Sequence, residues 1–445
     1  MLITSIHLRT LRSLVQRRWL AILLLVLVFG VLWLDFFSLP SSPVTPELDP
    51  SWCGALIHFS AQGLQFGKDV VFTHGPLGHL IAFVYTGELF HARVIWEFVS
   101  KTFFAVILCV TLFRLPAFWR PFFLFFVLPF IWADGTSDAL YFLVISCLAA
   151  LLFKQGSANP ALVILTGLLL AVFSLIKFTY FLLAIFLLTL LLAFYCKDRK
   201  PARALLLGFV FLIVLLLSWG IAGQQYGNLL SYITTSLDIC LGYKEAMGIP
   251  AGGNAIILTG LIAALLGLLQ CGLILIDSRQ PSVLFIGLFL AGETFLSWNR
   301  AFIRADDHVL SFFSLCPIVL LVMWIVVQPK PIVRYIGYTV NLLVFVICLF
   351  GIALQRPNAL ATSLGDTVRR LQANWTVVTG LPTATRQLRT QLTAAKSAHA
   401  LPRVQAEVRQ QTIDVLGYEQ GIALLNDLNY TPAPYFKGIA HTRRL

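Results

Sequence analysis

The sequence contains little charge for its length. Only 12% of its 445 residues are Asp, Glu, Lys or Arg, whereas 58% are hydrophobic and 36 are phenylalanine. Soluble domains carry about 25% charged residues, so this composition excludes an ordinary soluble protein. The many long apolar runs predict an all-α polytopic membrane protein.

Familiar chemical motifs are also missing. There is no GxxxxGK[ST], no GxGxxG after a predicted strand, no HExxH and no GxSxG, so cytoplasmic nucleotide use is unsupported. The eight cysteines show no CxxC spacing. Cys53 and Cys240 lie in predicted outer loops, where a disulfide between them stays open. The net charge of +12 is spread over short loops and the C-terminal region, which does not favour nucleic acid as a partner.

Eleven apolar runs are long enough, or nearly long enough, to cross a bilayer. One helix over residues 161–196 would measure about 54 Å against a hydrocarbon core of about 30 Å, so we divide it at Lys177. The run after residues 1–18 is too long for a cleavable signal and predicts a signal anchor. The predicted spans are residues 19–39, 92–113, 119–133, 139–153, 161–175, 178–196, 203–221, 254–276, 282–297, 309–327 and 332–353.

Basic residues set the predicted orientation, because cytoplasmic loops collect Lys and Arg. With a cytoplasmic N-terminus, the inner loops carry Arg9, Arg12, Arg17, Arg18, Arg114, Arg120, Lys154, Lys197, Arg199, Lys200, Arg203, Arg279, Lys330 and Arg334. The outer loops carry only Lys68, Arg93, Lys177, Lys244, Arg300 and Arg304. Acidic residues gather outside instead, which suggests an outward-facing site that uses carboxylates.

The chain therefore divides into three predicted parts. Residues 1–18 form a cytoplasmic N-terminus, and residues 19–353 form a transmembrane domain with a long outer loop at 40–91. Residues 354–445 predict a small soluble α/β module outside, with polar helices followed by strand-like pieces at 412–416 and 434–440. Its core is thin for its length, so it either leans on the membrane domain or is incomplete at Leu445.

The long first loop carries several candidate site residues. Asp49 precedes Pro50, a pattern typical of a helix start, and Trp52, Ala55, Leu56 and Phe59 then repeat as in a helix along the outer interface. Asp49 is interpreted as the cap of this helix or as a catalytic or metal-binding carboxylate with Glu47 as its companion, and the two roles are compatible. Further along, the strand-like "DVVF" and the turn around it present Asp69 and His74, which suit acid–base work or a structured plug.

The next two outer segments offer a metal site and a cation. Asp134 and Asp138, in "WADGTSDAL", form either a site for a divalent ion or a turn followed by a helix cap at Asp138. Lys177 lies at the outer end of a span, where it either snorkels to the headgroups or binds a lipid phosphate. Glu97 and Lys101, four residues apart in the second span, are interpreted as a structural pair.

The densest polar cluster is "SWNRAFIRADDHVLSFF", residues 297–313. Two arginines on the outer face run against the positive-inside bias, and guanidinium groups suit bidentate contact with phosphate. Salt bridges within the cluster are the alternative. The candidate substrate-binding residues here are Arg300, Arg304, Asp306, Asp307 and His308.

Together these features resemble the GT-C superfamily of membrane glycosyltransferases. The likeness rests on a cytoplasmic N-terminus, a long first outer loop with an acidic E-x-D, many spans and an outer C-terminal region. The stretches "DPSW…GLQFGKDVVFTHGPLG" and "NRAFIRADDHV" also resemble pieces of bacterial membrane proteins associated with that superfamily. The first loop lacks a D-D pair and no acceptor-binding motif is recognisable, so the acceptor class stays open.

The resemblance implies a transferase in the bacterial cytoplasmic membrane that moves a sugar from a polyprenyl-phosphate carrier to an acceptor outside. Asp49 would be the catalytic carboxylate, and Arg300 and Arg304 would contact the carrier phosphate. The partners would be the lipid-linked sugar and membrane lipid. The chemistry requires no cofactor, while Mg²⁺ or Mn²⁺ at Asp134 and Asp138 stays open. A transporter or flippase for a lipid-linked or anionic substrate is the alternative; the sequence leaves the oligomeric state undetermined.

Overall fold

The computed structural model describes residues 2–154 and 159–433, with side chains from Trp19 onward. Most of these residues are helical, and the apolar helices indicate a polytopic all-α membrane protein. Eight helices are long and apolar enough to span a membrane: α1 (Leu2–Phe36), α3 (Phe90–Arg114), α7 (Phe178–Lys197), α8 (Pro201–Ile221), α10 (Asn254–Asp277), α11 (Pro281–Ile303), α12 (Val309–Val326) and α13 (Pro331–Gln355). Three shorter apolar helices accompany them: α4 (Arg120–Phe130), α5 (Asp138–Phe153) and α6 (Pro160–Ile176).

Helices α5 and α12 form the centre of the bundle. Nearly every side chain on both helices is buried, as expected of helices that are apolar all round. Helix α5 packs against α12, α11, α7 and α3, and α12 packs against α13. The outer helices α8 and α10 expose many apolar side chains, which suit a lipid-facing surface.

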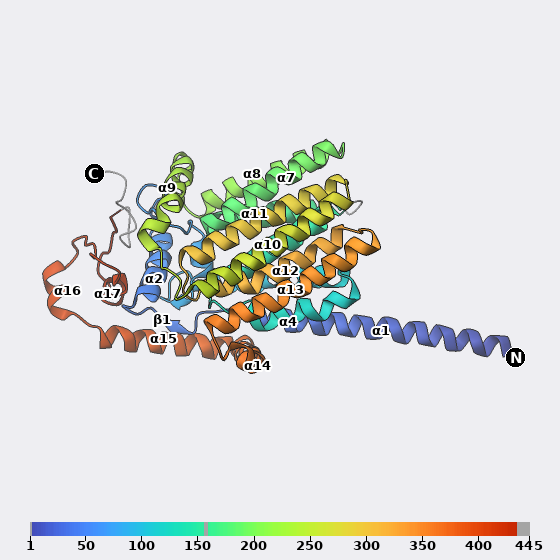
Figure 1. Ribbon diagram of the computed structural model, residues 1–445. Coiled ribbons are helices and arrows are strands. Elements are labelled where there is room, and N and C mark those ends of the chain that lie inside the picture. Colours follow the sequence, from blue (N-terminus) through green and yellow to red (C-terminus); the bar gives the residue numbers. More distant parts are fainter. Residues whose placement is uncertain (1, 155–158, 434–445) are drawn as a thin grey trace.

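The two ends of the bundle differ. The N-terminal half of α1 projects from one end, whereas α2 (Leu48–Ala61), α9 (Leu229–Met247) and the C-terminal helices gather at the other (Figure 1). A short parallel pair, β1 (Ser42–Pro43) with β2 (Val84–Tyr85), and the 3-10 helices η1 (Gly78–Ile81), η2 (Ala117–Trp119) and η3 (Tyr226–Asn228) complete the described elements. Following the predicted orientation, we refer to the end that carries α2 as the outer end.

The first outer loop is attached to the junction between α6 and α7. Gly75 donates its backbone N–H to Ile176 O at 3.1 Å, and Phe178 donates to Thr73 O at 2.9 Å. Lys177 between the two helices is extended (φ −148°, ψ 138°), so the predicted break falls at that residue. A Cβ at Gly75 would lie 2.4 Å from Leu175 O, so only glycine permits this approach.

Three details of the first loop correct the sequence predictions. Helix α2 begins at Leu48 with Glu47 as its N-cap, so the prediction that Asp49 is the cap was wrong by two residues. Residues 69–72 form no strand, because this segment folds into a turn with a single bridge between Phe66 and Val70. Half of the residues of α2 are buried, and helix α17 (Gln420–Leu425), far away in the sequence, packs against it.

The C-terminal region is helical where it is described. Helices α14 (Ala359–Thr379), α15 (Leu381–Ala398) and α16 (Pro402–Val408) precede α17, and α14 packs against α1 and α4. The predicted strand at 412–416 is reduced to one bridge between Ile413 and Tyr430, while the piece at 434–440 lies outside the described residues. Gly421 N donates to Ser51 Oγ of α2 at 3.1 Å, so this region leans on the membrane domain.

Candidate functional site

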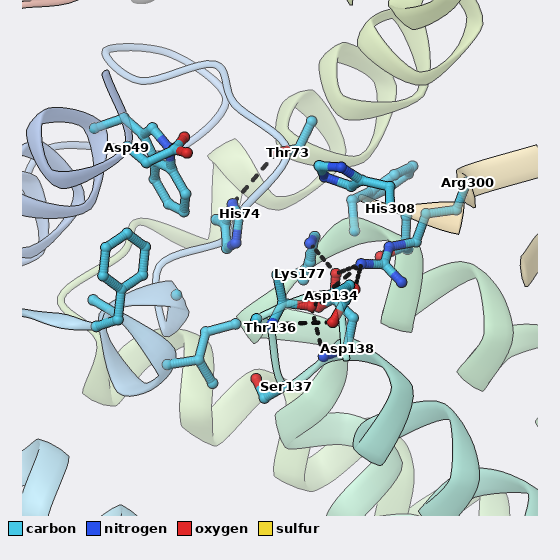
Figure 2. A pocket seen from close by; sticks show the side chains of 18 of the residues that line it. Asp49, Thr73, His74, Asp134, Thr136, Ser137, Asp138, Lys177, Arg300 and His308 are labelled. Atoms are coloured by element: carbon cyan, nitrogen blue, oxygen red, sulfur yellow. Dashed lines mark hydrogen bonds and ion pairs between the residues drawn. The ribbon is translucent and has the colours of Figure 1, made fainter. Parts of the chain in front are cut away.

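A cavity of about 450 Å³ lies at the outer end of the bundle (Figure 2). Its walls come from α2, the first outer loop, α3, the loop before α5, the α6–α7 junction, α9 and α11. Eight of the twelve predicted site residues line it: Asp49, His74, Asp134, Asp138, Lys177, Arg300, Arg304 and His308. Segments more than 250 residues apart in the sequence, such as those of Asp49 and Arg304, therefore meet around one space.

Asp138 is the centre of a buried ionic cluster on one wall. It is the first residue of α5, after the N-cap Ser137, so the alternative that Asp138 is itself the cap was wrong. Its carboxylate accepts from Lys177 Nζ at 2.6 Å and from the hydroxyl of Tyr180, and it pairs with Arg300 Nη2 at 2.5 Å. A buried carboxylate requires such partners, since charge without compensation is costly in this environment.

Asp134 completes this cluster from the preceding loop. Its carboxylate accepts from the backbone N–H and the hydroxyl of Thr136 at 3.0 and 2.9 Å, an Asx-type turn that Gly135 permits with φ +74°. Arg300 Nη2 lies 3.2 Å from Asp134, and Arg300 Nη1 donates to Ser311 Oγ at 3.1 Å. Arg300 thus joins the second outer loop to the start of α12.

These contacts bear on the predicted metal site. Lys177, Tyr180 and Arg300 already engage the oxygens of Asp138, so a divalent ion at Asp134 and Asp138 would have to displace two cations. The described part of the chain contains no group of three His, Cys, Asp or Glu side chains arranged to hold a metal ion. The donor set therefore fits an ionic cluster better than a metal centre.

A second cationic group stands at the start of α12. Arg304 Nη2 donates to Asp306 at 2.9 Å, and His308 Nδ1 lies 2.5 Å from the same carboxylate. Partial burial raises the pKa of Asp306, but the contacts with His308 and Arg304 outweigh it and the pKa is lowered. Arg304 and His308 line the cavity with Asp306 behind them. Of the two arginines, only Arg304 forms a salt bridge within residues 297–313, because Arg300 pairs with Asp134 and Asp138.

Asp307 lies apart from this group. Its carboxylate accepts from Arg356 Nη2 at 2.6 Å and from Gln355 Nε2 at 3.3 Å, so it ties the start of α12 to the end of α13. The hydrogen bond from Arg356 lowers the pKa of Asp307. Asp307 is not among the cavity-lining residues, which indicates a structural contact rather than a substrate contact.

The opposite wall carries Asp49, Trp52 and His74. The indole N–H of Trp52 donates to Asp49 Oδ1 at 2.8 Å, and the ring of Trp52 lies 5.0 Å from that of His74. Trp52 therefore belongs to the cavity wall. Figure 2 shows Asp49 and Arg300 on opposite sides, with His74 between them in this view.

The two remaining predicted acids of the first loop lie outside the cavity lining. Glu47 contributes its carbonyl, which accepts from Ser51 N at 2.9 Å, and its side chain makes no capping hydrogen bond. Asp69 Oδ2 accepts from Gln65 N at 2.9 Å and closes the turn before Val70. The E-x-D pattern therefore places one carboxylate at the cavity and one away from it.

A third wall was not predicted as part of the site. On α3, Arg93 pairs with Glu97, and Lys101 Nζ lies 3.5 Å from the same Glu97 carboxylate. The predicted pair of Glu97 and Lys101 is therefore present, with Arg93 added, and all three line the cavity. The sequence contained a signal for this wall, because ionisable residues spaced by four within a span occupy one helix face and are rarely without function.

Five cations and four carboxylates line the cavity: Arg93, Lys101, Lys177, Arg300 and Arg304, with Asp49, Glu97, Asp134 and Asp138. Apolar side chains from the first outer loop, α7, α9 and α11 also belong to the lining. In comparisons with known proteins, no family model matches the sequence, no curated sequence is similar to it, and no solved structure matches the fold. Functional inference therefore rests on the cavity itself.

Proposed function

We propose that this protein is a membrane glycosyltransferase of the GT-C type, which moves a sugar from a polyprenyl-phosphate carrier to an acceptor at the outer face. The observation that supports this most is the arrangement of charge across one cavity. Asp49 is exposed and its carboxylate accepts one hydrogen bond in the described structure, from Trp52, while Arg300 lies on the opposite side in Figure 2. Arg304 and Lys177 line the same cavity. A base and a phosphate site on facing walls are what transfer from an activated lipid sugar requires.

The proposed step uses these groups in defined roles. The acceptor hydroxyl attacks the anomeric carbon and Asp49 takes its proton. The new bond from the acceptor oxygen to carbon forms as the bond from carbon to the phosphate oxygen breaks, and the phosphate leaves with the electron pair. Arg304 is the proposed phosphate contact, because it lines the cavity and pairs with one carboxylate, that of Asp306, whereas Arg300 pairs with two. Arg300 and Lys177 add positive potential, although Asp134 and Asp138 neutralise part of it.

We further propose eleven spans in a bacterial cytoplasmic membrane, with the N-terminus in the cytoplasm and the C-terminal region outside. The eight long and three short apolar helices together supply that number. The basic residues near Lys197 and Lys200, between α7 and α8, support a cytoplasmic position for that junction. The cavity, at the opposite end of the bundle, would then face outward.

No cofactor is needed for this chemistry, because the carrier phosphate is already a good leaving group. A divalent ion would be an addition rather than a requirement, and it would compete with Lys177 and Arg300 for Asp138. Activity that persists in a chelator is therefore expected.

The experiment is an assay of purified protein with a panel of radiolabelled polyprenyl-phosphate sugars. Wild type should bind one carrier and release its sugar to water, which takes the place of the acceptor, and Asp49→Asn should bind that carrier without releasing the sugar. Glu47→Gln is the matched control, since Glu47 is two residues away but does not line the cavity. The proposal fails if no carrier binds, or if Asp49→Asn releases sugar as fast as Glu47→Gln. Carrier that moves across vesicle membranes with its sugar intact would instead establish the flippase alternative.

A further inference from the structure

Helix α14 has an unusual distribution of polar and apolar side chains. The face that packs on the membrane domain is polar, with Ser363 and Thr367 buried. From the same face, Arg370 donates to Asp35 Oδ1 from Nε at 2.9 Å and from Nη2 at 2.6 Å, and Asn374 Nδ2 donates to Leu34 O at 2.8 Å. A helix of a soluble module would place its apolar side chains in this contact.

The apolar side chains of α14 instead point away from the protein. At 3.6 residues per turn they fall within an arc of about 80°. Leu364 is 66% exposed and Trp375 is 62% exposed, values that are costly in water for side chains of this size. The members of this apolar face are Leu360, Leu364, Val368, Leu371 and Trp375.

A third face of α14 is polar and exposed. It contains Arg369, paired with Asp366, together with Gln372 and Thr376. The circumference of α14 therefore divides into three successive faces: one that packs on the protein, one that is apolar and exposed, and one that is polar and exposed. This order suits a helix lying at a boundary between hydrocarbon and water, because each face then meets a matching medium.

The position of α14 matches the edge of a bilayer. Its polar contacts are with residues near the last turns of α1 and α4, including Leu128 O, which accepts from Arg370 at 2.6 Å. Figure 1 shows α14 nearly end-on, while the spanning helices run across the view, so its axis crosses the bundle. Exposed apolar side chains on α13, among them Phe350 and Leu354, continue the lipid-facing surface toward it.

We propose that α14 is an interfacial helix whose apolar face is buried in the outer leaflet, with the lipid acyl chains as its partner. Trp375 then lies at headgroup level, where tryptophan is favoured. The position of α14 also bears on the cavity, because the chain continues from α14 through α15 to α17, and α17 packs on α2 in the cavity wall. Ser51 of α2 accepts a hydrogen bond from Gly421 N of α17. The membrane would thus hold the C-terminal helices against one wall of the site. This inference does not depend on the proposed transferase activity.

The test uses an environment-sensitive fluorophore on single cysteines in reconstituted vesicles. Among the eight free cysteines, Cys196 is exposed and Cys240 is partly exposed, so both are first replaced by serine. Leu364→Cys reports on the apolar face, and Thr376→Cys on the polar exposed face of the same helix. Both positions are exposed, so neither label disturbs packing.

Lipids with brominated acyl chains should quench the label at Leu364→Cys several-fold more than the label at Thr376→Cys, with a blue-shifted emission at the first position. Val368→Cys, on the same face, should behave like Leu364→Cys. Equal quenching at the two faces, or none at Leu364→Cys, would overturn the proposal. Disulfide-linked dimers at Leu364→Cys without lipid quenching would assign the face to a second copy and would also overturn it.

Discussion

Replacing Asp138 with asparagine tests whether the buried ionic cluster supports the cavity. The change keeps the shape of the side chain and removes its charge. Arg300 retains Asp134 at 3.2 Å, but Lys177 loses the only carboxylate that it contacts in the described structure. Removing one partner of a buried ion pair costs about 3–5 kcal/mol, because the other charge stays buried without compensation. Loss of an acidic residue in the first turn of α5 adds only about 0.3–1 kcal/mol.

Asp307→Asn is the matched control at the same end of the bundle. Its pair with Arg356 has side chains that are 51% and 47% exposed, and an exposed pair of this kind contributes about 0–1 kcal/mol. The free energy of unfolding, measured by denaturant titration in a mild detergent, should therefore fall far more for Asp138→Asn than for Asp307→Asn. Adding Lys177→Met to Asp138→Asn removes the uncompensated cation and should recover part of the loss. The reasoning is refuted if the two single variants have the same free energy of unfolding, or if the double variant has a lower free energy of unfolding than Asp138→Asn.

Three further predictions concern the first loop and the orientation. Gly75→Ala should detach the loop from the α6–α7 junction and increase its cleavage by protease, because a Cβ would lie 2.4 Å from a carbonyl oxygen, whereas Gly227→Ala has open space and should change nothing. Burial lowers the pKa of His79 from 6.5 to about 4, so between these pH values the unfolded chain binds a proton that the folded chain excludes. The free energy of unfolding should therefore fall as the pH drops from 6.5 toward 4, and His79→Gln should reduce this pH dependence. In a Cys240→Ser background, an impermeant maleimide should reach the exposed Cys196 only from the cytoplasmic side, and labelling of Cys196 from outside would contradict the proposed orientation.

Much of the fold could be predicted because membrane spans are read from composition and length. The eleven apolar runs each fall on a helix, and the break at Lys177 followed from the limit that the bilayer sets on helix length. The details of the outer end could not be predicted in the same way. Helix α2 packs against α17, and a contact between segments that are about 370 residues apart leaves no periodic signal in the sequence.

The candidate site shows a similar division. That polar residues of several outer loops would meet was predictable, since alternate loops of a bundle lie at the same end. The pairing among them was not: Arg300 pairs with Asp134 and Asp138 rather than with the neighbouring acids Asp306 and Asp307. Pairing is decided by how helices rotate and approach one another, which spacing within one segment does not encode.

The role of α14 was concealed for a related reason. Its sequence is mixed enough to read as a polar helix of a soluble module. Only the contacts of Arg370 and Asn374 with α1 and α4 show which face is covered by protein and which is left for another medium. The meaning of an amphipathic pattern depends on which face the protein occupies.

The measurement that tests the central claim most directly is a high-resolution map of the wild-type protein with a bound polyprenyl-phosphate sugar. The account predicts the phosphate beside Arg304, and the sugar within reach of the Asp49 carboxylate across the cavity. Carrier density that bypasses this cavity, or a sugar held where Asp49 cannot reach it, would contradict the account.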